Sequence, residues 1–160
     1  TSQALQSTTP TVVLDRVQDT GNVGSILRSA SAFGFKQVIA LRGTAALWSP
    51  KVLRAGMGAH FGMHLIESAQ IECLAQLQIP LLTTSSHLGP FVHELLTQKR
   101  LPAACAWVMG HEGQGVSEEI MALAHMQVRI AQPGGEESLN VAAAAAICLH
   151  TSAVMAAGSR

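Results

Sequence analysis

Apolar residues occur along the chain in short, almost continuous runs, and these runs alternate with segments of helical character. Six runs predict β-strands: 11–17, 36–43, 60–67, 79–86, 105–110 and a short run from Val128. The intervening segments predict helices: about a dozen residues ending at Gly34, a short helix opened by Ser49 and Pro50, 68–77, a turn around 91–98, 117–124 and a long C-terminal helix. Apolar strands linked by helical crossovers predict an α/β fold, with a mostly parallel sheet and helices on both faces.

The stretch 128–147, VRIAQPGGEESLNVAAAAAI, combines a short strand, a loop rich in glycine and carboxylates, and an alanine-rich helix. Ser138 is suited to the N-cap of that helix, which is expected to be buried because its small side chains allow close packing. Polar groups and free N–H donors at a buried helix start are costly unless something polar lies there. The triplet Ser138, Leu139 and Asn140 is therefore a candidate ligand site, and an ordinary cap on a core helix is the simpler alternative.

Composition predicts one packed domain. The chain has 160 residues, of which 48% are hydrophobic and 12% charged, a balance opposite to that of a disordered chain. Residues 1–10 are polar, end in proline and are expected to form a linker or tail before a domain at 11–160. The three cysteines, Cys73, Cys105 and Cys148, lack metal-binding spacing, so we expect free thiols in a reducing cytoplasm.

The C-terminal apolar segment is interrupted by His150, Thr151 and Ser152. This interruption keeps its uninterrupted apolar run below the roughly eighteen residues of a membrane span, so no membrane association is expected. The formal net charge is +0, which argues against binding nucleic acid by bulk electrostatics. Any basic patch must therefore be local.

Three glycine-bearing loops follow strands and open helices, where ligands of open α/β sheets collect. In the first loop, Gly21 and Gly24 are expected to relax the backbone, and Arg28 follows Gly24 by one helical turn. An alternative is a packed turn with a solvent-exposed arginine. The second loop, 110–115, suggests close backbone approach to a ligand but lacks the glycine order and lysine of a phosphate-binding loop. Two carboxylates in the third, 134–140, also disfavour phosphate.

These loops carry a specific resemblance. The segments NVGSILRSASAFG, VMGHEGQGVS and VRIAQPGGEESLNVAAAAAI resemble, in order and spacing, the three signature motifs of the SpoU (TrmH) family of RNA ribose 2′-O-methyltransferases, within the SPOUT superfamily. The segment SPKVLRAGMGAHF is also similar to this family. The resemblance covers the chain from about residue 12 to 155.

The resemblance implies a deep C-terminal trefoil knot, a homodimer, S-adenosylmethionine as cofactor and a ribose 2′-hydroxyl of rRNA or tRNA as substrate. The residues it implies for catalysis are Asn22, Arg28, Glu112, Ser138 and Asn140. Those it places beside the cofactor are Thr83, Thr84, Gly110, Ile130 and Leu139. Residues 11–160 would then be the catalytic domain, with an N-terminal RNA-binding domain missing. Local physics alone does not predict the knot, because threaded chains are rare.

At four positions the chain has a residue other than the one that is common in this family: Thr20, His111, Ala131 and Ala142. None removes a group implied in catalysis, although His111 changes the second loop. Methyl transfer to a hydroxyl requires alignment of two reactants and removal of a proton, without a metal. Since a guanidinium stays protonated in most settings, Arg28 has two possible roles: proton acceptor assisted by a substrate phosphate, or positioner of the hydroxyl.

Other readings remain open at this point. His60 and His64 stand four apart, but the predicted strand and the missing glutamate argue against a zinc helix. A hydrolase triad lacks its G-x-S-x-G turn. A non-catalytic RNA-binding module with a methyltransferase-like fold is the main alternative, followed by a nucleotide-binding α/β domain. The joint presence of the five implied catalytic residues favours the enzyme.

The sequence does not indicate which RNA or which nucleotide is modified. Aromatic residues make up only 4% of the chain, which leaves few side chains to stack on bases. Specificity is therefore expected in a further domain or on a dimer surface. Apolar or small residues beyond the needs of one core, such as Ala30, Phe33, Val154 and Met155, agree with a dimer.

Overall fold

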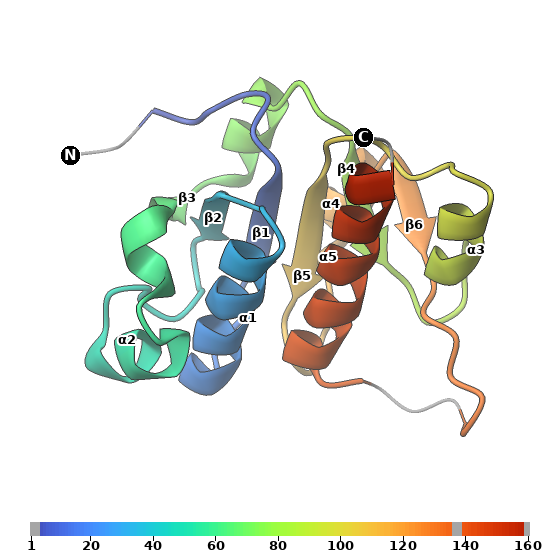
Figure 1. Ribbon diagram of the computed structural model, residues 1–160. Helices are drawn as coiled ribbons and strands as arrows, with labels where there is room; N and C mark the ends of the chain where they lie inside the picture. Colours follow the sequence, from blue (N-terminus) through green and yellow to red (C-terminus); the bar gives the residue numbers. More distant parts are fainter. Residues whose placement is uncertain (1–3, 136–138, 159–160) are drawn as a thin grey trace.

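Six parallel strands form one sheet in the order β3-β2-β1-β5-β4-β6 (Figure 1). The computed structural model describes residues 4–135 and 139–158. The strands are β1 (Thr11–Asp15), β2 (Gln37–Leu41), β3 (His64–Ala69), β4 (Leu81–Thr84), β5 (Ala106–Gly110) and β6 (Met126–Val128). Central strands β1 and β5 pair from Thr11 with Ala106 to Asp15 with Gly110, so their carboxyl ends are level.

Helical segments cover both faces of the sheet. They are α1 (Thr20–Ala32), α2 (Pro50–Gly56), α3 (Val92–Thr97), α4 (Glu118–Leu123), α5 (Val141–Gly158) and the 3-10 helices η1 (Ala59–Gly62) and η2 (Ile71–Gln76). Alternate residues of β1 serve two cores: Leu14 packs with α1, α2, α3 and α5, whereas Val13 packs with η2 and α4. The predicted α/β fold with helices on both faces is confirmed.

Two predicted elements differ in type or extent. His60 does not begin a strand: it lies in η1, fully buried, with its Nε2 2.6 Å from the carbonyl oxygen of Leu47. The strand begins at His64, whose Nε2 faces the carbonyl oxygen of Ala4 instead. The helix expected at 68–77 is a 3-10 segment, η2. The apolar run that predicted a strand from residue 60 therefore begins with a 3-10 turn, which buries the His60 ring against Leu47.

The expected N-terminal tail is anchored over its described part. The backbone N–H of Gln6 donates to Gln37 Oε1 (2.8 Å), and Gln37 Nε2 donates back to the Gln6 carbonyl (2.9 Å). Further on, Gln78 N–H donates to the Ser7 carbonyl at 2.8 Å, and Leu5 packs against the core beside η2. Residues 4–10 are thus part of the packed domain and not a frayed linker.

The C-terminal helix α5 corrects the expectation about membrane spans. By length and composition it is apolar enough to cross a membrane, with a mean hydropathy of 1.7 over 18 residues. Thr151 does not interrupt it, because its hydroxyl donates to the Ile147 carbonyl at 2.7 Å within the helix. One such helix is weak evidence, since core helices pass the same test. The buried Ser152 accepts from Trp107 Nε1 at 2.9 Å, which fixes α5 against β5.

The expectation of free thiols agrees with the structure. Cys73, Cys105 and Cys148 are all unpaired with one another. Burial raises the pKa of Cys105 to about 12, although Ser152 partly opposes the shift, and burial raises the pKa of Cys148 to about 12 as well. Both thiols are therefore inert core groups at neutral pH.

Candidate functional site

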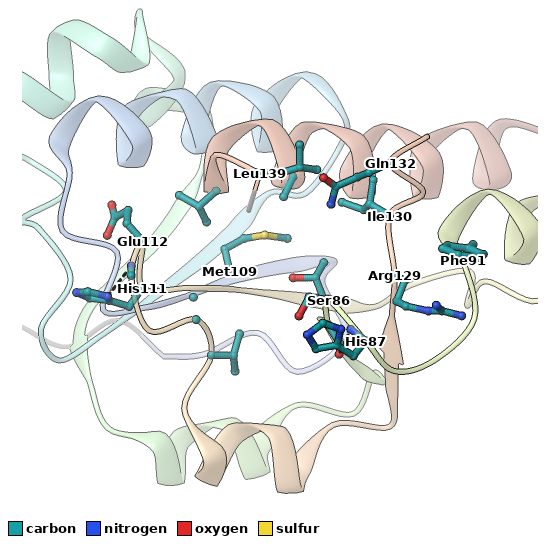
Figure 2. A pocket seen from close by; sticks show the side chains of 18 residues that line it. Ser86, His87, Phe91, Met109, His111, Glu112, Arg129, Ile130, Gln132 and Leu139 are labelled. Atoms are coloured by element: carbon teal, nitrogen blue, oxygen red, sulfur yellow. Dashed lines mark hydrogen bonds between the residues drawn. The ribbon is translucent and has the colours of Figure 1, made fainter. Parts of the chain in front are cut away.

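A cavity of about 520 Å³ lies beyond the carboxyl ends of β4, β5 and β6 (Figure 2). The residues that line it come from the loops after these three strands, together with Phe91 and the start of α5: 84–87, 109–113, 115–116, 129–130, Gln132, Leu139, Val141 and Ala144. Its volume is within the range of small-molecule sites, and the lining mixes apolar side chains with a few polar groups. The site therefore has room for an organic cofactor.

The loop after β4 is held tightly against β6. A Cβ atom on Gly89, whose φ is +94°, would collide with the carbonyl of Gln127. Arg129 N–H donates to the Pro90 carbonyl (2.8 Å), its Nε donates to the Gly89 carbonyl (2.7 Å), and its guanidinium lies 4.2 Å above the Phe91 ring. The two chain segments thus run side by side in parallel at backbone contact, and Phe91 and Arg129 form one wall of the cavity.

Glycine is required at position 110 for a different physical reason from the one that the sequence suggested. A Cβ atom there would collide with the backbone of Gly115 and Val116, so the glycine lets the loop 110–116 fold back on itself. Gly110 still lines the cavity. The fold of the loop itself therefore excludes a side chain at Gly110, before any contact with a ligand is considered.

Three of the implied catalytic side chains form one hydrogen-bonded chain. Asn140 Nδ2 donates to Asn22 Oδ1 at 3.1 Å, and Asn22 Nδ2 donates to Glu112 Oε2 at 3.3 Å. The three come from the start of α5, the first turn of α1 and the loop after β5. Figure 2 shows Glu112 at the side of the cavity near the start of α1. The network therefore joins the first, second and third sequence motifs at the cavity edge.

Glu112 holds two loops together. Its carboxylate accepts the backbone N–H groups of Gln18 (3.1 Å) and Asp19 (2.9 Å) as well as the Asn22 amide. Partial desolvation raises the pKa of Glu112, but these hydrogen bonds outweigh it and the net shift is downward. The carboxylate is therefore ionised at neutral pH and already engaged, which suits positioning of Asn22 better than proton abstraction.

Asn140 also caps α5. Its Oδ1 accepts the N–H groups of Ala142 (2.8 Å) and Ala143 (3.2 Å). The helix is described from Val141, so the expected cap at Ser138 is replaced by one at Asn140. Ser138 itself lies outside the described residues, and its implied catalytic role stays a prediction. The Asn140 side chain is exposed, so the helix start is not buried as the alanine run suggested.

Arg28 is apart from this cluster. It is exposed, it does not line the cavity, and its guanidinium has no hydrogen bond or ion pair with any of the described residues. It stands six positions after Asn22, so on a helix of about 3.6 residues per turn its side chain points roughly 120° away from the Asn22 direction. The sequence correctly placed Arg28 on α1, but one copy of the chain does not bring it to the cavity.

Of the residues implied to contact the cofactor, most line the cavity and one does not. Thr84, Gly110, Ile130 and Leu139 line the cavity. Thr83 does not: it is fully buried in β4, and its hydroxyl has no partner among the described residues. Successive residues of a strand point to opposite faces, so only one of the two threonines can face the cavity.

Several site residues were missed by sequence reasoning. Asp15, at the end of β1, accepts the Ser117 N–H at 2.7 Å, and Arg16, with φ +63°, donates to Gln114 Oε1 at 2.7 Å and to the Gly115 carbonyl at 3.2 Å. These contacts hold the second glycine-bearing loop against the carboxyl end of β1. The sequence contained one signal for the role of Asp15, because this carboxylate ends the buried strand TVVLD.

His111 takes a similar role within the loop. Its Nδ1 accepts the N–H groups of Gly113 and Gln114, each at 3.0 Å. An asparagine oxygen commonly caps a turn in this manner. The departure at His111 therefore substitutes one acceptor for another. As for metals, the described residues contain no group of three His, Cys, Asp or Glu that could hold an ion.

The chain is similar to known proteins over most of its length. Residues 9–150 match the model of the SpoU rRNA Methylase family. The chain is 32% identical over 145 residues to the 23S rRNA (guanosine-2′-O-)-methyltransferase RlmB of Bordetella pertussis, covering 88% of this chain and 58% of that protein. It covers only 16–26% of three matching mitochondrial rRNA methyltransferases. The chain therefore spans about half, or less, of the curated relatives it matches.

Two solved structures share the fold. A TrmH-family putative RNA methyltransferase from Porphyromonas gingivalis superposes with a TM-score of 0.84 at 34% identity, over 94% of this chain and 61% of that one. An AdoMet-bound rRNA methyltransferase from Sinorhizobium meliloti gives 0.78 at 29% identity, over 92% and 56%. Both likenesses cover more than nine tenths of this chain.

Proposed function

The chain belongs to the SpoU rRNA methylase family, and from this premise we propose that it transfers a methyl group from S-adenosylmethionine to a ribose 2′-hydroxyl of rRNA or tRNA. The observation that carries the proposal is the joining of Asn22, Glu112 and Asn140 in one network at the edge of a cavity that suits a cofactor. An RNA-binding module without catalysis would not need this arrangement beside a cavity.

The residues present fit S-adenosylmethionine. The apolar walls at Met109, Ile130 and Leu139 suit its adenosine, while the hydroxyl of Thr84 supplies a polar contact. The ionised Glu112 carboxylate at the wall is compatible with a cation and unfavourable to phosphate. The bound cofactor supplies an electrophilic methyl group on a cationic sulfur.

The chain's own groups would then align the second reactant. Asn140 donates to the Asn22 amide oxygen, and Asn22 donates an amide N–H to Glu112, so both ends of the Asn22 amide are fixed. We assign Arg28 to the RNA hydroxyl, where its fork holds a phosphate and lowers the cost of charge developing on oxygen. Ser138 remains assigned to the same site by its motif.

A homodimer agrees with the position of Arg28 outside its own cavity. Ile147 and Val154 of α5 are 38% and 41% exposed, and they provide an apolar face for a second copy. Of the residues expected to be surplus, Ala30 is buried in the core, and Phe33 and Met155 pack against it, so only Val154 supports the dimer. Light scattering at tens of micromolar that reports a monomer contradicts the dimer.

Support for the knot comes from the loop after β4, which stays paired in parallel with the chain that leaves β6 towards α5. Val92 N–H donates to the Arg129 carbonyl at 2.8 Å, directly beyond the close contact of Gly89 with Gln127, and the chain then continues to α5. We infer that α5 follows the chain through this loop. A chain pulled from residues 4 and 158 and unfolded by force should extend by less than about 3.3–3.6 Å per residue, because a tightened knot retains length. Full extension excludes the knot.

The test of the function uses cofactor binding and transfer together. Calorimetry with S-adenosylmethionine should give heat with a micromolar dissociation constant, and labelled methyl groups should appear on 2′-oxygens of rRNA or tRNA that lacks its native modification. RNA binding without cofactor binding supports the non-catalytic module instead. A cytoplasmic location is part of the proposal, and relatives named mitochondrial make fractionation its direct check.

A further inference from the structure

An exposed aromatic pair lies on elements that do not line the cavity. Phe61 of η1 is 82% exposed and Trp48, in the loop before α2, is 47% exposed. Their rings are 6.4 Å apart at an interplanar angle of 64°. Large aromatic side chains are seldom left this open without a partner. The two rings, called here the Trp48–Phe61 platform, need a ligand or a covering surface.

The Trp48–Phe61 platform is held in place by a buried side chain, His60. The buried His60 ring lies 4.9 Å from the Trp48 ring, and its Nε2 is fixed on the Leu47 carbonyl. A Cβ atom on Gly56 would come within 2.9 Å of the His60 ring, so α2 closes tightly over it. Trp48 is thus a pre-ordered surface whose stacking costs little conformational entropy.

The stretch of sequence that carries the platform has charges of one sign. From Thr20 to Ile66 the sequence contains five cations, Arg28, Lys36, Arg42, Lys51 and Arg54, and no aspartate or glutamate. Half of the chain's 10 Lys and Arg thus fall in a stretch that has none of its 10 Asp and Glu. Lys51 and Arg54, three apart on α2, are both exposed. The next acid in the sequence is Glu67, whose carboxylate accepts the N–H of Leu47, the residue before Trp48, at 3.0 Å.

The platform continues towards the catalytic network through α1. Figure 1 shows α2 beside the first turns of α1. A Cβ atom on Gly24 would collide with Ala55 of α2, so the two helices touch within two residues of Asn22. Arg28 stands one turn beyond Gly24 on α1. The exposed cations of α2 and the exposed Arg28 therefore stand on two helices that are in direct contact.

We propose that the Trp48–Phe61 platform, flanked by Lys51 and Arg54, binds a single-stranded nucleotide next to the one whose ribose enters the site. Aromatic rings accept base faces and neighbouring cations accept the phosphates, which is the chemistry of single-stranded RNA recognition. A duplex hides its base faces and does not fit. The proposal rests on the proposed function for its ligand and adds the recognition that the neutral overall charge leaves unexplained.

Binding of a labelled single-stranded oligouridine to the 160-residue chain tests the platform. Phe61→Ala removes an exposed ring without loss of core volume, so its thermal stability should be unchanged while affinity falls about tenfold. Phe61→Tyr should restore it. Leu123→Ala, at an exposed apolar residue of α4, is the matched control and should bind as the parent does. A base-paired RNA of equal length should not distinguish these variants.

Charge and fluorescence give independent readouts. Lys51→Gln should reduce the slope of log affinity against log salt by about 0.7, whereas Lys36→Gln, before β2 at the other end of the sheet, should leave it unchanged. Trp107 is buried and hydrogen-bonded to Ser152, so quenching by RNA reports Trp48. Trp48→Phe should abolish the quenching and retain most of the affinity.

The outcomes separate this inference from the function itself. Unchanged oligouridine affinity and unchanged KM for RNA in Phe61→Ala overturn the platform and leave methyl transfer standing. A change in molecular mass on light scattering, with RNA affinity intact, makes the surface an interface between copies and also overturns it. Phe61-dependent RNA binding by a chain that neither takes up cofactor nor methylates supports the platform and removes the proposed activity.

Discussion

The two sides of the sheet's carboxyl edge use glycine for different purposes. Beside β2, Gly24 and Gly56 let α1, α2 and the His60 ring pack together. Beside β4 and β5, Gly89 lets its loop approach the β6 backbone closely, and Gly110 lets its loop fold back on itself. The first side is therefore a packed helical surface and the second a set of loops around a cavity. Mutations on the two sides should impair different steps of one reaction.

Arg28→Ala provides the largest expected effect, and it belongs to the helical side. The residue is exposed, so the free energy of unfolding should change by less than about 0.5 kcal/mol. Cofactor affinity should also be unchanged, because Arg28 does not line the cavity. Methyl transfer with saturating cofactor should fall by roughly a hundredfold or more.

Arg28→Lys sharpens that test because it keeps the charge and loses the planar fork. Arg42→Ala, which removes another exposed cation, is the control for a general loss of positive charge. Rates close to the parent value in both Arg28 variants contradict a role at the hydroxyl.

The pair Gly24→Val and Gly110→Val tests the division directly. Both add bulk where a Cβ atom would collide with neighbouring atoms, so both should destabilise the fold by about 1–3 kcal/mol. Only Gly110→Val should weaken cofactor binding, by about tenfold, because it displaces the loop 110–116. Thermal unfolding and calorimetry below the unfolding temperature measure the two effects. Equal loss of cofactor affinity in both variants removes the distinction between the sides.

Glu112→Gln addresses the contact that joins the sides. The folded-state pKa of Glu112 is below its ordinary value of 4.5, so its stabilisation is present above about pH 4.5 and disappears as the pH falls through the lower folded value. The stability difference between parent and variant should therefore shrink on acidification over that window. Glu119→Gln, at an exposed carboxylate without a hydrogen bond among the described residues, should not reproduce this change.

The sequence predicted the alternation of strands and helices because each buried strand needs a continuous apolar run. It could not predict that His60 would turn inward, because that depends on Leu47, thirteen residues earlier. The cap at Asn140 is a local contact with Ala142, and the sequence analysis assigned the cap to Ser138 because both residue types suit that position. The motifs identified Asn22, Glu112 and Asn140 through the family resemblance, whereas their mutual hydrogen bonds required coordinates. Conversely, Trp48 and Phe61 were visible in the sequence, but only their exposure distinguishes a platform from a core.

The smallest effect is expected at His111, and it tests whether a departure from the family's common asparagine is conservative. His111 Nδ1 accepts the N–H groups of Gly113 and Gln114 in an exposed loop. His111→Asn supplies an oxygen acceptor at a similar place, so stability and cofactor affinity should match the parent. His111→Ala leaves both N–H groups to water and should cost about 0.5–1 kcal/mol, as for loss of a turn or helix cap. Denaturant unfolding of the three proteins measures the difference. If Asn and Ala are equally destabilising, the imidazole contributes through its bulk, and the acceptor explanation is wrong.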